Sequence, residues 1–395
     1  MIRILFIDDE TRILDGMRRS LHCMRAEWQM RFATSGADAL LALAQEPADV
    51  VVSDMRMPGM DGAQLLAEVK RLYPETVRLI LSGEAEPALI IRVTSSAHQY
   101  LAKPCDGPTL QAAIARTHAL RALLSSERIA AIVGTVDTLP SPPKAYMELL
   151  ASLRSEDSST NTVARIIGRD IAMTAKILSI ARSGFFGQRN GVQSVERAVT
   201  LVGVDAITTL VLGQQLFGSS SSHQLPGFDL QRLADHSFET AACARAVARH
   251  EKLPANVGES AFLGGILHDL GKLVIATRNP PASATDQPTS QAATLELMHA
   301  HHAEVGAYLL GLWGFPDSLV EAVAWHHAPG RVSETGLGLC GLLHIGDLLA
   351  HQREVNVGDA PYAAPDQAYL ESIGCANSWP DWLEALPQLP TAMAG

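Results

Sequence analysis

The sequence predicts a doubly wound α/β domain with a five-stranded parallel sheet, followed by an all-α helical domain. In the first 120 residues or so, short unbroken apolar runs alternate with segments of helical periodicity. That alternation is typical of a parallel sheet covered by helices on both faces. From Val136 onward the apolar residues follow helical spacing almost throughout.

The strand candidates are apolar runs that each end at a polar residue; they lie at 2–7, 50–53, 77–81 and 100–102. Helical periodicity between and after these runs predicts helices near 11–25, 36–45, 61–72, 86–96 and 108–120. Pro108 suits the first turn of the last of these helices.

A chain of 395 residues fits two or three domains. The predicted organisation is an α/β domain over 1–120, a connecting helix over 121–135, a helical domain over 136–350 and a C-terminal extension over 351–395 that packs on it. The connecting helix has no stop signal before Gly134, so it either continues as one rod or breaks near Ser125-Ser126. Pro140 to Pro143 mark the start of the helical domain.

Composition excludes several classes of protein. A formal net charge of -11 without a basic arm argues against nucleic acid as a partner. The five cysteines are far apart and form no C-x-x-C pair, which argues against a disulfide framework and a thiolate zinc site. The N-terminus lacks a signal-peptide pattern, and no apolar run reaches the roughly 18 residues that span a bilayer. We therefore expect a cytoplasmic protein with no membrane partner.

The polar residues that end the apolar runs predict the first functional site. Asp8-Asp9, Asp54, Ser82 and Lys103 each follow a different run. Because the carboxyl ends of parallel strands meet at one edge of a sheet, these side chains should converge. Carboxylates, a hydroxyl and an ammonium together suit a hard cation and a phosphate.

The spacing assigns each of these residues a role in phosphoryl transfer. Asp54 ends the central strand and is the candidate nucleophile, and Asp8 and Asp9 would hold Mg2+ together with it. Three crowded carboxylates repel one another, so a divalent cation is close to a requirement. Lys103 would contact the phosphoryl oxygens, and Ser82 would donate a hydrogen bond to one of them.

These motifs resemble the receiver domain of two-component response regulators, which has a flavodoxin-like fold. The match includes Asp8-Asp9, the stretch from Asp54 to Gly62, Ser82-Gly83 and Lys103-Pro104. The resemblance implies that Asp54 accepts a phosphoryl group from a phosphohistidine of a sensor histidine kinase or a phosphotransfer protein.

The same resemblance adds two further roles. It implies that the backbone carbonyl of Arg56 completes the Mg2+ shell. It also implies that Ser82 and Tyr100 rearrange together after phosphorylation and reshape the face built by the fourth helix and the fifth strand. The added charge of roughly -1.5 to -2 is a physical reason for such a switch.

Histidines and acids predict a second site in the helical domain. The candidate ligands lie on separate helical segments: His236, His268, Asp269, His302, His326, His327 and Asp347. Imidazoles and carboxylates can hold one or two ions of Fe, Mn or Zn and activate a bound water. Lys272, one turn beyond His268, could neutralise a phosphate. Eight other histidines are interpreted as ordinary residues: His22, His118, His223, His250, His299, His301, His344 and His351.

The helical region resembles the HDOD domain, an all-helical relative of HD-type phosphohydrolases. The matching segments are 139–143, 166–178, 194–203, 302–307, 313–316 and 326–327. The resemblance implies a signalling output that acts through protein contacts without catalysis. Carried over from the catalytic HD-GYP relatives, which hydrolyse cyclic di-GMP, the metal positions would be the seven ligands named above. The Gly-Tyr-Pro motif of those relatives is absent after His326-His327, which argues against cyclic di-GMP cleavage.

Two hypotheses from different classes remain open. In the favoured one, phosphorylation changes the position of a non-catalytic output domain, which binds an unidentified downstream protein. In the other, the chain is a phosphorylation-gated, metal-dependent phosphodiesterase acting on a cyclic dinucleotide or another phosphoester. A homodimer is also open, because Leu110, Ile114, Leu120 and Leu124 could form an interface or could pack on their own domain.

Overall fold

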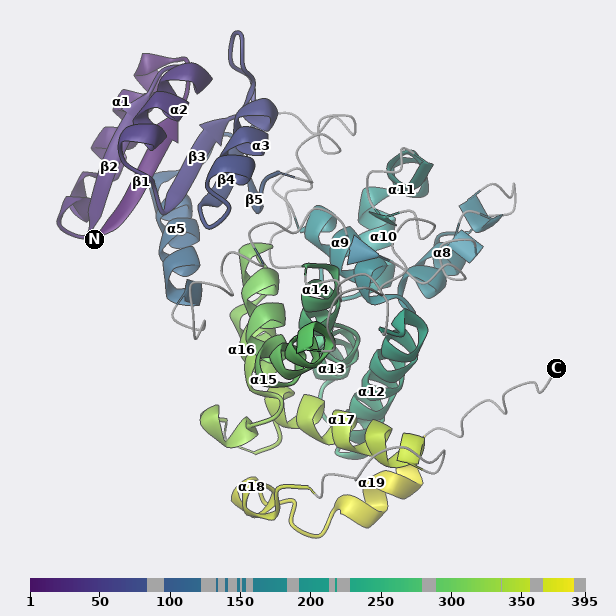
Figure 1. The fold of residues 1–395 in the computed structure, drawn as a ribbon. Coiled ribbons are helices and arrows are strands. Elements are labelled where there is room, and N and C mark those ends of the chain that lie inside the picture. Colours follow the sequence, from purple (N-terminus) through teal and green to yellow (C-terminus); the bar gives the residue numbers. More distant parts are fainter. Residues whose placement is uncertain are drawn as a thin grey trace.

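Figure 1 shows the computed structural model, in which a sheet domain precedes a larger bundle of helices. The structure describes residues 1–83, 96–121, 133, 139–140, 148–149, 151–153, 159–182, 192–212, 217–218, 228–278, 289–334, 336–355 and 365–386. The helix expected at 86–96 and the connecting helix expected at 121–135 therefore lie almost entirely outside the described residues.

The N-terminal domain contains a five-stranded, fully parallel sheet in the order β2-β1-β3-β4-β5. Its strands are β1 (Ile2–Ile7), β2 (Trp28–Ala33), β3 (Val50–Asp54), β4 (Val77–Ser82) and β5 (Gln99–Ala102). This topology confirms the predicted doubly wound fold. The apolar runs did not reveal β2, because it is an edge strand in which Gln29 and Arg31 interrupt the apolar pattern.

Helices cover both faces of the sheet. The helices are α1 (Thr11–Ser20), α2 (Gly36–Gln45), α3 (Gly62–Leu72) and α5 (Gly107–Arg121). Ile4 and Phe6 belong to the same core cluster as residues of α1 and α5, whereas Leu5 and Ile7 share a cluster with α2 and α3. The helix expected at 11–25 is shorter than predicted. It ends where Leu21 leaves the helical conformation with its side chain buried, and a 3-10 turn, His22–Ala26, follows.

One cation is buried in the sheet. The Arg78 side chain on β4 donates hydrogen bonds to the carbonyl oxygens of Ser96 (2.6 Å) and Thr76 (2.9 Å). Its Nη2 lies 2.8 Å from Nε2 of His98. Burial, together with the charge of Arg78, lowers the pKa of His98 well below its ordinary 6.5, so this imidazole is neutral in the folded chain.

The described residues of the C-terminal region are mostly helical, as predicted, and include one short strand pair, β6 (Leu139–Pro140) and β7 (Phe217–Gly218). Its helices are α8 (Thr160–Ile167), α9 (Ile171–Ala181), α10 (Val195–Val202), α11 (Val204–Leu212), α12 (Leu230–His250), α13 (Ala255–Leu267), α14 (Leu270–Arg278), α15 (Thr289–Leu312), α16 (Asp317–Trp325) and α17 (Leu339–Val355).

Glycines allow the central helices to approach closely. A Cβ atom at Gly265 of α13 would overlap the backbone of Ala241 on α12. At Gly271 of α14 a Cβ would overlap the carbonyl of His302 on α15, and at Gly346 of α17 it would meet the Thr240 carbonyl oxygen at 2.8 Å. These contacts bring five helices close together: α12 with α13 and α17, and α14 with α15.

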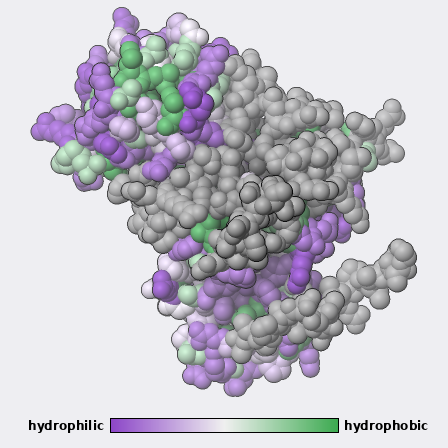
Figure 2. Space-filling model, in the orientation of Figure 1, coloured by the Kyte–Doolittle hydropathy of each residue, from purple (hydrophilic) through white to green (hydrophobic). Residues whose placement is uncertain are grey.

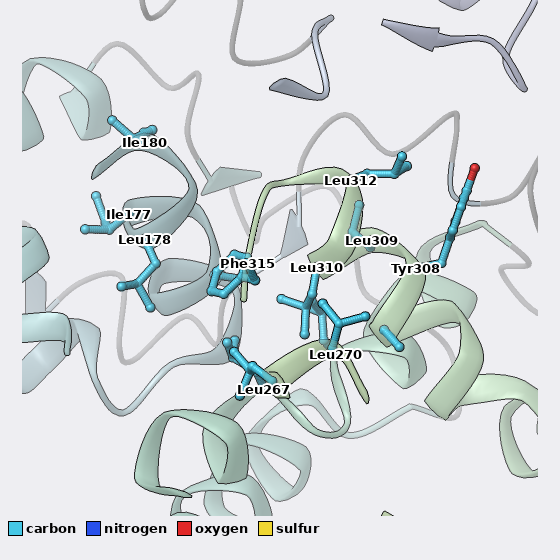
Figure 3. Packing of buried hydrophobic residues seen from close by; sticks show 14 of the residues in the cluster. Ile177, Leu178, Ile180, Leu267, Leu270, Tyr308, Leu309, Leu310, Leu312 and Phe315 are labelled. Carbon is cyan, nitrogen blue, oxygen red and sulfur yellow. The ribbon is translucent and has the colours of Figure 1, made fainter. Parts of the chain in front are cut away.

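The bundle core continues toward the sheet domain. Figure 3 shows Phe315, in the turn after α15, between Leu310 of α15 and Leu178 of α9, and all three belong to one buried cluster. Gly311 of α15 faces α5, because a Cβ there would overlap the Leu120 side chain. Leu110, Ile114 and Leu120 are all buried within the chain.

The C-terminal helices α18 (Gln367–Ser372) and α19 (Trp379–Ala385) pack on the bundle. The indole of Trp382 is fully buried, and its Nε1 donates a hydrogen bond to Glu251 Oε1 at 2.7 Å. In the view of Figure 2, the coloured surface of the helical region is mainly hydrophilic. Within the described residues, no helix combines the length and apolar character needed to cross a bilayer.

Candidate functional sites

The strand ends bring the predicted acidic residues to one edge of the sheet. Asp8 follows β1, Asp54 ends β3, Ser82 ends β4 and Lys103 follows β5. The register aligns the carboxyl ends of β1, β3, β4 and β5 side by side. The convergence predicted from the parallel order is therefore present in the structure.

Lys103 joins two of these carboxylates. Its Nζ lies 2.9 Å from Asp8 Oδ2 and 2.5 Å from Asp54 Oδ1. Burial opposes the charge on Lys103, but the hydrogen bonds and charges of Asp54 and Asp8 outweigh it and raise the pKa of Lys103. The ammonium thus offsets the repulsion between two buried carboxylates.

The loop after β3 shapes this pocket. The Arg56 N–H donates to Asp54 Oδ2 at 3.0 Å, and the Gly62 N–H donates to the Met55 carbonyl at 2.9 Å. A Cβ at Gly62 would overlap the Asp54 carbonyl oxygen, so only glycine fits there. Asp61 then caps α3 by accepting from the Gln64 N–H at 2.9 Å.

The other predicted residues of this pocket lie next to these contacts. Asp9 is exposed beside Asp8, which suits a ligand that completes a cation site from solvent. Ser82 and Tyr100 are buried on the neighbouring strands β4 and β5. Carboxylates and a backbone carbonyl are the hard oxygen donors that Mg2+ prefers, so the residues present fit this ion.

The helical region brings all seven predicted ligands together at the point where its helices approach. His236 comes from α12, His268 and Asp269 lie between α13 and α14, and His302 comes from α15. His326 and His327 follow α16, and Asp347 lies on α17. Asp347 Oδ1 is 3.0 Å from His236 Nε2.

The second carboxylate, Asp269, lies between other histidines of this histidine–aspartate cluster. Its Oδ2 is 3.4 Å from His268 Nε2, and its Oδ1 is 3.4 Å from His302 Nε2. The Nε2 atoms of His302 and His327 are 2.9 Å apart. Each carboxylate therefore faces imidazole nitrogens from at least two helices.

Hydrogen bonds to the backbone orient three of the imidazoles. Nδ1 of His268, His302 and His326 lies 2.8, 2.6 and 2.7 Å, respectively, from a carbonyl oxygen of its own helical segment. A carbonyl accepts only from a protonated Nδ1, so Nε2 carries the lone pair and points into the cluster. Nε2 of His268, Nε2 of His326 and Oδ1 of Asp269 are buried without a hydrogen-bond partner among the described residues. Metal-ligating histidines typically have this arrangement.

Burial also sets the protonation states. It lowers the pKa of His302 to about 4 and that of His326 and His327 to about 3, so these imidazoles are neutral near pH 7. Burial opposes the charge on Asp269 and Asp347, but surrounding histidines, together with Lys272 in the case of Asp269, outweigh it. Both carboxyl groups consequently have pKa values well below the ordinary range and are ionised.

Two residues make contacts that the sequence did not indicate. The Lys272 ammonium, a possible phosphate contact, lies 2.7 Å from Asp269 Oδ2 and so pairs with a candidate ligand. His351 was interpreted as an ordinary residue, but its Nδ1 lies 3.0 Å from Asp347 Oδ1 and its ring centroid is 4.4 Å from that of His236. Its spacing of four residues from Asp347 on one helix was the signal that could have identified it.

The donor atoms suit transition metals. Among the residues that the structure describes, four overlapping groups of three side chains each place their ligand atoms within 4.8 Å of one another. They are His302–His326–His327, His236–Asp347–His351, His236–His268–Asp269 and His268–His326–Asp347. Mixed imidazole and carboxylate donors match Fe, Mn or Zn, and overlapping groups suit two neighbouring ions.

Fold and sites together define a phosphoacceptor-type α/β domain joined to an HD-type helical domain. Family models agree: residues 4–115 match the response regulator receiver domain, and residues 139–329 match the HDOD domain. The chain is therefore a two-component response regulator with an N-terminal receiver domain and a C-terminal HDOD domain.

Known proteins match parts of the chain. The hydrogenase transcriptional regulatory protein HoxA of Cupriavidus necator is 37% identical over 103 residues, which cover 26% of this chain and 21% of HoxA. An uncharacterized protein of Treponema pallidum is 23% identical over 213 residues, which cover 50% of this chain and 39% of that protein. The chain thus spans well under half the length of these curated relatives.

Solved structures are similar to parts of the chain as well. One is the signal receiver domain of an HD domain-containing protein from Pseudomonas fluorescens Pf-5, with 32% identity, a TM-score of 0.28, and coverage of 29% of this chain and 92% of that one. Another is the MmoQ response regulator of Methylococcus capsulatus, with 24% identity, a TM-score of 0.47, and coverage of 62% and 98%.

Proposed function

We propose that Asp54 is phosphorylated, with Mg2+, by a sensor histidine kinase or phosphotransfer protein, and that this controls contacts between the HDOD domain and a downstream protein. The observation that supports it most is the Lys103 ammonium held by both Asp54 and Asp8. In this proposal residues 1–120 receive the signal, 121–135 connect, 136–350 respond, and 351–395 support the output domain.

Each residue contributes a distinct step. The Asp54 carboxylate attacks the phosphorus of the donor phosphohistidine, and the leaving imidazole takes up a proton. Mg2+ held by Asp8, Asp9, Asp54 and the Arg56 carbonyl would supply charge neutralisation. Lys103 then exchanges its contact with Asp54 for one with a phosphoryl oxygen.

The change at Asp54 has a short route to the HDOD domain. Ser82 and Tyr100 act as the switch next to the phosphoryl group in this proposal. Gln99, adjacent to Tyr100 on β5, donates from its side-chain amide to the Gly311 carbonyl of α15 at 3.4 Å. A rearrangement of β5 would therefore act directly on α15.

The test compares the full chain with Asp54→Asn and with Asp15→Asn, an exposed control on α1. A phosphohistidine donor with Mg2+ should label the parent chain and Asp15→Asn but not Asp54→Asn. Beryllofluoride should change hydrogen exchange on β5 and α15 in the first two proteins only. Labelling of Asp54→Asn at the parent rate would refute the assignment.

A second candidate function is metal-dependent phosphodiester hydrolysis by the HDOD domain. The inward Nε2 atoms of His268 and His326 favour it, because both are buried without a hydrogen-bond partner among the described residues, which a merely structural histidine would not leave so. Bound metal would supply an activated water, and Lys272 could move from Asp269 to a phosphate oxygen. Metal analysis and assays with cyclic dinucleotides and bis(p-nitrophenyl) phosphate test it. If the protein is purified without metal and hydrolyses none of these substrates when Fe, Mn or Zn is added, the phosphodiesterase function is ruled out. The protein-contact function then remains as the only proposal.

A further inference from the structure

A cavity of about 380 Å³ lies between the receiver domain and the HDOD domain. The receiver side contributes Gln99, Thr109 and Arg116, and the HDOD side contributes Ser179, Arg182 and Trp313. The volume is within the range of small-molecule sites. The lining differs from that of an ordinary apolar cavity because both domains supply an arginine.

Arg182 is the unusual residue of this cavity. Only 5% of it is exposed, yet within the described part of the chain no acidic side chain pairs with it. Its Nη1 donates to the Val192 carbonyl, its guanidinium lies 5.1 Å from the Phe315 ring centroid, and its Nε has no hydrogen-bond partner among the described residues. Burial and the nearby charge of Arg116 lower the pKa of Arg182 to about 10. A buried, partly unsatisfied guanidinium is costly unless an anion joins it.

Arg116 is only partly neutralised. Its Nε lies 2.8 Å from Asp317 Oδ1, and its Nη2 donates to the Phe315 carbonyl. The Asp317 side chain is 83% exposed and can turn to solvent. Among the described residues, Asp317 pairs with Arg116 and no acid pairs with Arg182. The two guanidinium groups together therefore carry one excess positive charge.

We propose that this interdomain cavity binds a small phosphate-bearing molecule, held by Arg182 and Arg116. The hydroxyl groups of Ser179 and Thr109 line the same cavity as further donors. So many donors suit the oxygens of a phosphate better than those of a carboxylate, and arginine matches phosphate geometry with paired N–H groups. The remainder of the ligand would lie on the Trp313 ring.

Such a ligand would act as a second input to the response regulator. It touches α5 and the turn after α15 simultaneously, so it binds only the arrangement in which the two domains are in contact. Binding to one of two arrangements stabilises that arrangement. None of the arginines and hydroxyl groups that would hold the ligand belongs to the phosphoacceptor pocket, although Tyr100 of the proposed switch also lines the cavity.

The test uses inorganic phosphate as the probe, with acetate as the carboxylate arm, on the full unphosphorylated chain. Titration calorimetry at constant ionic strength with EDTA excludes binding through metal ions. Arg182→Gln should weaken phosphate binding at least about tenfold, the effect of losing one charged hydrogen bond. Asp317→Asn should tighten it, because the competing carboxylate is gone. Arg169→Gln, at an exposed arginine of the HDOD domain, is the matched control.

The two variants separate the outcomes. Weaker binding by Arg182→Gln, tighter binding by Asp317→Asn and no change in Arg169→Gln support the site. If Arg182→Gln does not fold, Arg116→Gln replaces it with the same expectation. No phosphate binding by the parent chain, equal affinity for acetate, or affinities unaltered by these variants would overturn the proposal.

Discussion

Replacing His326 by Met tests whether this histidine is a metal ligand or an ordinary residue of the core. His326 is fully buried, and its Nε2 has no hydrogen-bond partner among the described residues. An unpaired buried polar atom costs about 1–3 kcal/mol. Met has a similar volume and removes that atom, while it also removes the Nδ1 hydrogen bond to Val323, worth about 1 kcal/mol. The metal-free variant should therefore be as stable as the parent chain or up to about 2 kcal/mol more stable.

The same variant should lose the response to metal. At a free metal concentration roughly 100 times Kd, binding stabilises the folded chain by about 2.7 kcal/mol. For a domain of this size that shifts Tm by roughly 5–10 °C. Calorimetry after EDTA, with and without added Mn2+ or Zn2+, measures both effects.

His301→Met, one position before the ligand His302, is the control, because His301 pairs with Glu304 outside the cluster. It should keep the metal response, and metal bound at the receiver pocket affects all three proteins equally. The reasoning would be refuted if metal left the parent Tm unchanged. It would equally fail if the metal-free His326→Met chain were more than about 2 kcal/mol less stable than the parent.

Three further outcomes follow from burial and charge. Trp382→Ala should lower the free energy of unfolding of the helical region by about 3–5 kcal/mol, measured by urea denaturation. Gly265→Val should prevent α13 from packing on α12 and abolish metal uptake, measured by elemental analysis. The depressed pKa of His98 means that only the unfolded chain gains a proton just below pH 6.5. His98 alone should therefore lower the stability by about 1.4 kcal/mol per pH unit below 6.5, and His98→Gln should remove this contribution from the slope measured by hydrogen exchange of β4 and β5.

The receiver pocket was predictable because a parallel sheet converts sequence position into spatial position. A polar residue at the end of each apolar run must lie at the same edge as the others, and Lys103 lies against Asp8 and Asp54 as that rule requires. Two elements were predicted less well. In the edge strand β2, polar residues alternate with apolar ones, so no apolar run marked it. Helix α1 ends before Leu21, earlier than the helical spacing of the sequence indicates.

The histidine–aspartate cluster was predictable in membership but not in arrangement. Adjacent His-Asp and His-His pairs stand out in a sequence, whereas the meeting of α12, α13, α14, α15 and α17 depends on close packing at glycines. His351 was missed, although its spacing of four residues from the candidate ligand Asp347 places both side chains on the same face of α17. The interdomain cavity was not predictable at all, since it exists only where α5 meets the turn after α15.

The two sites of the chain are connected through the same pair of helices. α15 carries His302 along its length and contacts α5 through Gly311 near its end. α16 begins at Asp317, which pairs with Arg116 of α5, and ends immediately before His326. A helix moves as a rigid unit, so a displacement of α5 after phosphorylation would act on both sides of the histidine–aspartate cluster. Coupling of this kind is reciprocal. A metal ion or partner that binds at the histidine–aspartate cluster would therefore also shift the conformational equilibrium of the receiver domain.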